Sequence, residues 1–110
     1  DVRLVGTVEQ ALDAEMPGAH TSIVVVTRSH EMDVEIVPML DATNARNIGV
    51  MGSKRRWAAT RSQLLESGVA AEALDRSHEP IGLDIGAETV EEIAVSILSE
   101  VIRVTASEDQ

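Results

Sequence analysis

Apolar and polar positions follow one another along this chain in blocks that predict alternating strands and helices. Two short apolar runs have the character of strands, Ser-Ile-Val-Val-Val-Thr at residues 22–27 and Ile-Gly-Val-Met at residues 48–51. The first run is rich in β-branched residues and has no polar alternation, which is typical of a strand buried on both faces. A weaker run at residues 2–5 predicts a further short strand.

Segments with helical spacing separate and follow these runs. They cover residues 8–15, about 33–41, 54–67, about 71–77 and the stretch that begins after residue 89. Thr7 with Gln10, and again Thr89 with Glu92, have the capping-box spacing, in which two side chains satisfy free N–H groups of a helix start. Pro38 falls inside the second helix and predicts either an irregular first turn or a kink.

The last helical segment carries a broad apolar stripe. Its members are Ile93, Ala94, Ile97, Leu98, Val101 and Ile102. Such a stripe predicts that the helix packs hard against the sheet and frays after Thr105. Earlier in the chain, Gly68-Val69 predicts a helix end of the Schellman type, and the Pro and Gly content of residues 79–86 predicts a shaped loop.

Strands that alternate with helices predict right-handed crossovers and a parallel sheet. The expected fold is therefore α/β, with three layers in which helices cover both faces of the sheet. A length of 110 residues with 44% apolar composition fits one domain over residues 1–110.

Composition narrows the classes of function. The formal net charge is −10 and Trp57 is the only aromatic residue, which argues against a nucleic-acid partner, since phosphates need a basic face and bases need aromatic platforms. The absence of Cys excludes disulfides and thiolate metal sites, and three scattered His are only weak support for metal binding. No apolar run is long enough for a membrane helix. We expect a soluble cytoplasmic protein.

The balance of charged residues also indicates a habitat. One Lys stands against eight Arg, and Asp plus Glu number 19. This is the composition expected of a protein that stays soluble in high salt. Our hypothesis is a halophilic source.

The stretch from Asn47 to Arg56 is the best candidate for a binding site. Gly52-Ser53 breaks an apolar run just before a helix, and Lys54, Arg55 and Arg56 follow as the only run of consecutive basic residues. At such a junction the first N–H groups of the helix point at one spot, where an anion is favoured. On residue types alone, pairing of these cations with acidic groups of the same chain is an equal alternative.

A second polar segment favours the site. Residues 27–30, Thr-Arg-Ser-His, follow the first buried strand as residues 52–56 follow the next. Both segments leave the sheet at the carboxyl ends of parallel strands, which is where ligands bind in α/β folds. Their convergence favours binding over internal pairing.

Three motifs then resemble one known family. They are Thr27-Arg28-Ser-His30-Glu-Met-Asp33, Gly49-Val-Met-Gly52-Ser53-Lys54-Arg55, and Pro80-Ile-Gly-Leu-Asp-Ile-Gly-Ala-Glu-Thr-Val-Glu-Glu-Ile-Ala-Val-Ser-Ile97 with Glu100. In this order they resemble the Rossmann-type C-terminal domain of the XdhC/CoxI family of maturation factors for xanthine and carbon monoxide dehydrogenases. The resemblance covers Val2 to Ile102.

The resemblance implies an accessory protein that binds molybdenum cofactor and helps to insert it into xanthine dehydrogenase or a related molybdenum hydroxylase, rather than a catalyst. The cofactor phosphate would lie at the glycine turn. The candidate cofactor-binding residues are Thr27, Arg28, His30, Gly52, Ser53, Lys54, Arg55 and Asp84. For His30 a solvent contact or a contact with Asp33 is an equal alternative, and for Asp84 a structural role is favoured.

Two other functions remain as alternatives. One is a Rossmann-type oxidoreductase that uses a nicotinamide nucleotide, NAD(P), and it is disfavoured because the glycine fingerprint and its acidic ribose partner are missing. The other is a scaffold that only bridges proteins. No pair of nucleophile and base stands out in the sequence, so no catalytic residue and no metal ligand is assigned.

The chain also departs from the family pattern. The family's domain opens with a strand and a Gly-Ala-Gly turn, and this chain begins after both, so the predicted sheet is incomplete at the N-terminus. Strand edges left open in this way predict cover by a second chain or by rearrangement. We therefore expect a homo-oligomer, with a dimer as the simplest form.

Overall fold

The computed structural model describes residues 6–27, 29–76 and 80–108. Its elements, in chain order, are α1 (Val8–Glu15), β1 (Ser22–Val25), α2 (His30–Asp41), β2 (Asn47–Val50), α3 (Lys54–Glu66), α4 (Ala71–Leu74) and α5 (Val90–Glu108). The strand predicted at residues 2–5 and the end of the helix predicted over 71–77 lie outside the described residues.

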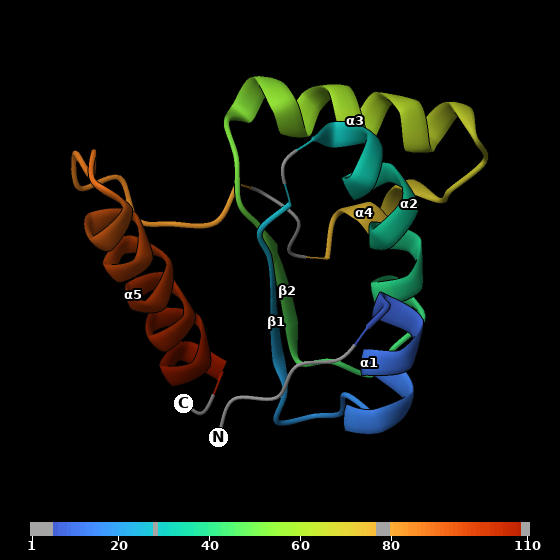
Figure 1. Ribbon diagram of the computed structural model, residues 1–110, viewed down its shortest axis with the longest axis horizontal. Coiled ribbons are helices and arrows are strands. Elements are labelled where there is room, and N and C mark those ends of the chain that lie inside the picture. Colours follow the sequence, from blue (N-terminus) through green and yellow to red (C-terminus); the bar gives the residue numbers. More distant parts are fainter. Residues whose placement is uncertain (1–5, 28, 77–79, 109–110) are drawn as a thin grey trace.

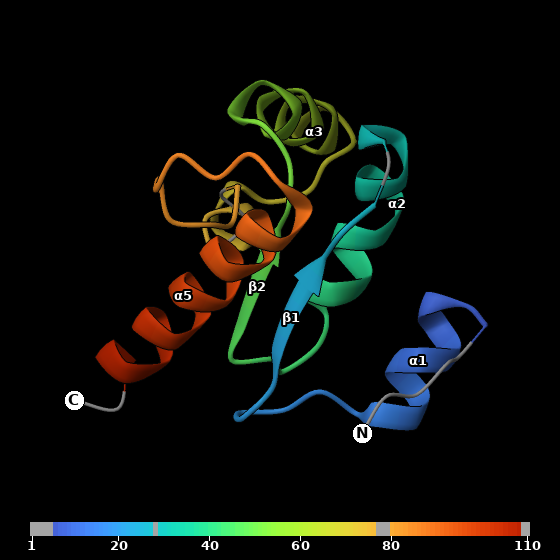
Figure 2. The same ribbon diagram turned by 60° about the vertical axis from the view of Figure 1, so that its left-hand side comes forward.

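The sheet of the described residues has two strands, β1 and β2, which run parallel with Ser22 opposite Asn47 and Val25 opposite Val50. Beyond β2, Pro80 forms a single parallel bridge with Val50, which continues the sheet by one step. Helices α1 and α2 lie on one side of the strands and α5 lies on the other (Figures 1 and 2). The predicted α/β class with helices on both sides of a parallel sheet is confirmed.

The core fills the space between the sheet and helices α2, α3 and α4. Its fully buried members are all aliphatic: Val25, Val37, Leu40, Ala45, Ile48, Val50, Leu64 and Leu74. Trp57 is half-buried against this cluster. Because the core is built without Phe or Tyr, β-branched residues of the strands and Leu residues of the helices supply its volume.

Both predicted capping boxes are present. The Thr7 hydroxyl accepts from the Gln10 N–H at 3.1 Å, and the Gln10 side chain accepts from the Thr7 N–H at 3.0 Å. Thr89 and Glu92 form the same reciprocal pair at 3.1 and 3.0 Å. These bonds satisfy N–H groups that have no partner inside a helix, so they fix where α1 and α5 begin.

The end of α3 is also as predicted. Gly68 has a φ of +95°, its N–H donates to the Leu65 carbonyl, and the Val69 N–H donates to the Leu64 carbonyl. This is the bonding pattern of a Schellman motif, and the left-handed φ explains the Gly.

Helix α2 differs from the prediction. It begins at His30 rather than near residue 33, because Ser29 caps it by accepting from the Met32 N–H at 3.4 Å. It continues through Pro38 to Asp41 as one helix. The proline has no N–H, so the helix loses one internal hydrogen bond there, and buried Val37 and Leu40 hold it in place on either side.

Two burial predictions were wrong. The run at residues 22–27 is not buried on both faces: residues 22–24 of β1 are only half-buried, and Val26, just beyond the strand, is 61% exposed. Among the described residues no strand pairs with the outer edge of β1, so that edge lacks the neighbour that would cover it.

The apolar stripe of α5 also does not pack against the sheet as a whole, since Leu98 and Ile102 are 60% and 68% exposed. A two-stranded sheet is too narrow to cover so broad a stripe. The helix also continues past Thr105 to Glu108.

The loop after residue 79 packs directly on the sheet. Gly49 of β2 is buried, and a Cβ added there would lie 2.2 Å from Cδ1 of Ile81. Ile81 therefore takes the space that a side chain at position 49 would fill.

None of the described helices is long and apolar enough to cross a membrane.

Candidate functional site

The two polar segments do meet at the carboxyl edge of the sheet. The Met51 N–H donates to the Val25 carbonyl at 2.8 Å, which keeps the strands paired up to the point where both end. From there the chain passes through Thr27 into α2 on one side and through Gly52 into α3 on the other. The topology thus brings together two turns that lie about 25 residues apart in the sequence, as parallel pairing requires.

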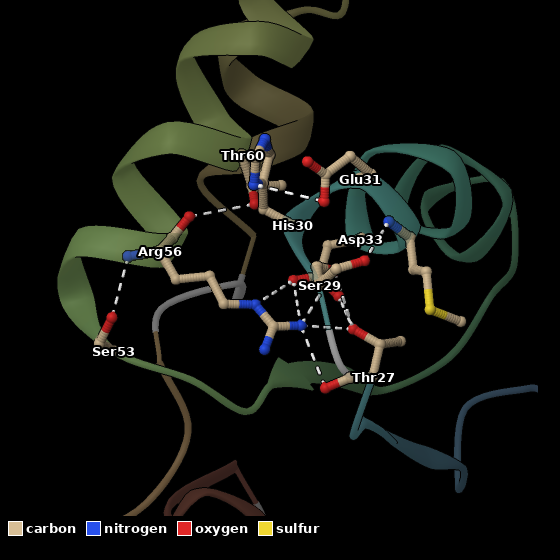
Figure 3. A network of polar contacts seen from close by, with 9 residues as sticks. Thr27, Ser29, His30, Glu31, Asp33, Ser53, Arg56 and Thr60 are labelled. Atoms are coloured by element: carbon tan, nitrogen blue, oxygen red, sulfur yellow. Dashed lines mark hydrogen bonds and ion pairs between the residues drawn. The ribbon is translucent and has the colours of Figure 1, made fainter.

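A single arginine ties these turns together (Figure 3). The Arg56 guanidinium donates to the Thr27 carbonyl at 3.2 Å and to the Ser29 carbonyl at 3.1 Å. It also forms an ion pair with Asp33, with both nitrogen–oxygen distances at 3.0 Å. The Thr27 hydroxyl lies between Asp33 and Arg56 and bonds to both. The planar donor fork of arginine suits such a cluster of acceptors.

The sequence analysis named Asp33 only within a motif and as a contact of His30, and it missed the pairing of Asp33 with Arg56. Its side chain is 1% exposed, so its charge must be balanced inside the protein. A signal was present in the sequence, because Asp33, Val37 and Leu40 stand at the i, i+4, i+7 spacing that places residues on one helix face. A carboxylate on the same face as two core residues needs a partner, and Arg56 supplies it.

The three basic residues that begin α3 therefore have different environments. Arg56 is committed to internal pairing, as the alternative interpretation of the sequence held. Lys54 and Arg55 are exposed, and neither has an ion pair or hydrogen bond from its side chain within the described part of the chain. In that turn a cation opposes the helix dipole, so the helix itself gains no stability from either charge.

The start of α3 leaves backbone N–H groups available as hydrogen-bond donors to a ligand. The Ser53 hydroxyl accepts from the Arg56 N–H at 3.0 Å, and the Ser53 carbonyl accepts from the Trp57 N–H. Lys54 and Arg55 occupy the first two helical positions, whose N–H groups have no partner inside a helix. Gly52 precedes them with a φ of +144°, a conformation that other residues rarely adopt. The junction therefore presents two N–H groups beside an exposed cation.

An open cleft of about 500 Å³ adjoins this junction. One wall comes from the end of β2 and the start of α3, another from the loop after residue 79, and a third from α5. Its lining residues are Met51, Gly52, Lys54, Pro80, Ile81, Gly82, Leu83, Asp84, Ile85, Gly86, Ala87, Ile93 and Ser96. The volume is in the range typical of small-molecule sites, and most of the lining is apolar or backbone.

The loop that forms one wall is fixed on both sides. The Ile81 N–H donates to the Val50 carbonyl at 2.9 Å, and the Leu83 N–H donates to the Ser96 carbonyl at 3.1 Å. Between them, the Gly82 N–H donates to the Glu100 carboxylate at 3.3 Å. The loop is therefore held between β2 and α5, and the cleft has a defined shape.

Some of the candidate residues line the cleft and others lie in the network around Arg56 or elsewhere. Gly52, Lys54 and Asp84 line the cleft. Thr27 lies in the network around Arg56, and Ser53 caps α3. Arg55 is exposed in the same turn as Lys54 but does not line the cleft. Arg28 lies outside the described residues.

His30 is the first residue of α2 and lies near the network rather than in the cleft. Its Nδ1 is 3.6 Å from the Glu31 carboxylate, which is an ion pair when the imidazole is protonated. The backbone N–H of Glu31 and then His30 hold the pKa of the Glu31 carboxyl below its usual range. Within the described residues, no group of three His, Cys, Asp or Glu side chains is placed to hold a metal ion.

Comparison with known proteins gives a family and two relatives. Residues 1–101 match the family model described as the XdhC Rossmann domain. An uncharacterized protein of Escherichia coli (strain K12), YqeB, is 38% identical over 80 residues, which are 73% of this chain and 15% of that protein. A protein of Bacillus subtilis (strain 168), named as a probable xanthine dehydrogenase subunit, is 37% identical over 95 residues, or 86% of this chain and 27% of that protein. The chain thus spans less than a third of either relative.

Proposed function

The chain belongs to the family of XdhC Rossmann domains, and from this premise we propose that it is an accessory domain of the xanthine dehydrogenase system that binds molybdenum cofactor for insertion into the dehydrogenase. One of its relatives is named as a probable xanthine dehydrogenase subunit. The observation that carries the binding proposal is the cleft in which Lys54 and the start of α3 stand beside a glycine-rich loop.

The cleft suits the group chemically. Molybdenum cofactor is a pterin dithiolene that carries a phosphate, and the phosphate is the part that this chain's residues would recognise. The Lys54 ammonium would supply charge and the N–H groups of Lys54 and Arg55 would donate to phosphate oxygens. Gly52 would allow close approach, and Met51 and Ile93 offer apolar surface to the pterin face. When bound, the cofactor supplies the molybdenum chemistry of the enzyme that receives it.

The network around Arg56 has a different part in this proposal. It holds the turn after β1 against the first turn of α3, so the Lys54 ammonium and the helix N–H groups are oriented before a ligand arrives. Preorganisation of this kind raises affinity because less entropy is lost on binding. Thr27 and Asp33 then act by positioning Arg56 rather than by touching the ligand.

The test compares two cations of one helical turn. Lys54→Ala and Arg55→Ala remove the same charge, but only Lys54 lines the cleft. Loss of one charge-assisted hydrogen bond is worth about 1.5–3 kcal/mol, so we expect Lys54→Ala to weaken molybdopterin binding by about tenfold or more. Arg55→Ala should change affinity by less than about threefold. The fluorescence of Trp57, the only tryptophan and a residue of the same turn, reports the titration.

A third variant tests the sign of the charge effect. Asp84 places a carboxylate on the cleft wall, where it repels an anionic ligand. Asp84→Asn should therefore tighten binding by about two- to fivefold, which corresponds to roughly 0.5–1 kcal/mol for an exposed charge pair. Equal effects of the two cation variants would contradict the placement of the site. Tighter binding of a nicotinamide nucleotide than of molybdopterin would favour the oxidoreductase instead.

A further inference from the structure

Helix α5 has a buried face and an exposed apolar face that point in opposite directions. One faces the body of the protein, where Ser96 and Ile97 are 6% and 7% exposed. On the other side, Val95, Leu98 and Ile102 are 56%, 60% and 68% exposed. At 3.6 residues per turn these three residues fall within an arc of about 60°, so they form one continuous stripe. We call Val95, Leu98 and Ile102 the outer stripe.

The outer stripe is accessible over its whole length. In both views α5 lies at the left-hand edge of the molecule and no other element lies beyond it (Figures 1 and 2). The i, i+3, i+7 spacing of the outer stripe is that of a helix that packs against another helix. Scattered exposed apolar residues are ordinary, but a stripe with this spacing marks an interaction surface.

One basic residue in the C-terminal half of α5 is complementary to the acidic first turn under a two-fold rotation. The first turn is acidic, with Glu91 and Glu92, and Arg103 lies five residues before the helix ends at Glu108, in a turn that precedes the last one. Within the described part of the chain, the Arg103 side chain has no ion pair with any carboxylate. A second α5 that runs antiparallel would bring its acidic first turn to this arginine.

The geometry of such a pair follows from the helix repeat. A two-fold axis between Leu98 and Ser99 places Val95 of one copy opposite Ile102 of the other. With a rise of 1.5 Å per residue, Arg103 then stands about 7 Å from the axis and Glu91 about 11 Å on the other side. The rotation brings them to within about 4–5 Å along the helix direction. Around the helix, Glu91 falls within the arc of the outer stripe and Arg103 about 80° from Val95, so the long arginine side chain reaches the contact from the flank of the helix. The contact occurs twice, as it must in a symmetric dimer.

We propose that the outer stripe of α5 is the interface of a homodimer, in which two copies of α5 pack antiparallel. The apolar stripe supplies the buried surface, and the Arg103–Glu91 pairs set the direction of the second helix. Opposed helix dipoles add to this preference, since the N-terminus of each α5 then lies beside the C-terminus of the other. The proposal is independent of the cofactor cleft, which α5 lines with Ile93 and Ser96 on its other face.

The first test removes the apolar contact. Leu98→Glu places a charge at the centre of the pair and should raise the dimer dissociation constant by at least about tenfold in sedimentation velocity. Leu65→Glu is the matched control, because Leu65 is a 41% exposed leucine on α3, outside the interface. It should leave the dissociation constant unchanged. A wild-type protein that is monomeric at all concentrations tested overturns the proposal, as does equal sensitivity of the two variants.

The second test identifies the occupant as a second copy in this orientation. Arg103→Glu and Glu91→Arg each create like-charge contacts in a homodimer, so each alone should weaken association. Mixing the two variants restores both opposite-charge contacts, and heterodimers should form with nearly wild-type affinity at about 0.15 M salt. Glu9→Arg on α1 is the matched control for the change in net charge that Glu91→Arg makes. No recovery on mixing would rule out the antiparallel α5 pair, whichever other surface then holds the copies together.

Discussion

The ion pair between Asp33 and Arg56 makes a quantitative prediction about stability. Asp33 is 1% exposed, and its carboxylate depends on the Arg56 guanidinium and the Thr27 hydroxyl for its hydrogen bonds. Arg56→Met keeps most of the side-chain volume but leaves this buried charge without its counter-charge. Breaking a buried pair by removing one partner costs about 3–5 kcal/mol. We expect a loss near the lower value, about 3 kcal/mol, since the Arg56 side chain is 22% exposed.

A double-mutant cycle of Arg56→Met and Asp33→Asn separates the coupling energy of the ion pair from the contribution of the rest of the network. Asp33→Asn keeps the shape and the bond to Thr27 but removes the buried charge, so it should cost about 1–2 kcal/mol. The double variant has no uncompensated carboxylate, and its loss should be smaller than the sum of the single losses by about 1–3 kcal/mol. Urea unfolding followed by Trp57 fluorescence measures all four proteins.

Two results would refute this reasoning. Additive losses would mean that the two side chains do not act on each other in the folded protein. A loss below about 0.5 kcal/mol for Arg56→Met would mean that the buried carboxylate is satisfied in another way. If the cycle gives the expected coupling, Arg56→Met should also weaken the cofactor ligand, because the turn after β1 then no longer holds the start of α3.

Three further predictions follow from other parts of the fold. The backbone N–H groups of Thr89 and Glu88 hold the pKa of Glu92 below its ordinary value of 4.5. The Glu92 carboxylate therefore stabilises the fold above pH 4.5, and this contribution is lost as the pH falls through the lowered pKa. Glu92→Gln keeps the cap without a titrating group, and acid unfolding curves should show a weaker pH dependence than wild type; identical curves would contradict this. Gly49→Ala should cost about 1–3 kcal/mol by overpacking against Ile81, with partial rescue by Ile81→Val, whereas full stability would place Ile81 elsewhere. The free energy of unfolding should rise between about 0.1 and 1 M salt, because salt screens the repulsion within a net charge of −10 as the Debye length falls from about 10 to 3 Å. An unchanged free energy of unfolding would count against a halophilic protein.

Local signals predicted much of the fold from the sequence. Thr7, Thr89 and Gly68 fixed helix ends because caps depend on residues three or four positions apart. The meeting of the turns after β1 and β2 could also be predicted, since parallel strands share a carboxyl edge. What failed was burial, because the exposure of Val26 and Leu98 depends on which elements lie beside them, and periodicity does not carry that information.

The candidate site was predictable only in part for the same reason. The run Lys54-Arg55-Arg56 marked the right turn of the chain, but composition could not divide the three cations between a ligand and the protein itself. That division depends on the direction of each side chain from the helix, which puts Arg56 over Asp33 and Lys54 on the cleft. The binding role of Lys54 and the repulsive effect of Asp84 stay predictions.

The most direct test of the central claim is an NMR titration of the ¹⁵N-labelled chain with molybdopterin. The account predicts that the largest amide shift changes fall on Lys54 and Arg55 at the start of α3 and on Gly82 to Gly86 in the loop, while the outer stripe of α5 stays unchanged. Saturating binding with the largest changes elsewhere, or no change at millimolar ligand, would contradict the claim that this cleft holds the cofactor.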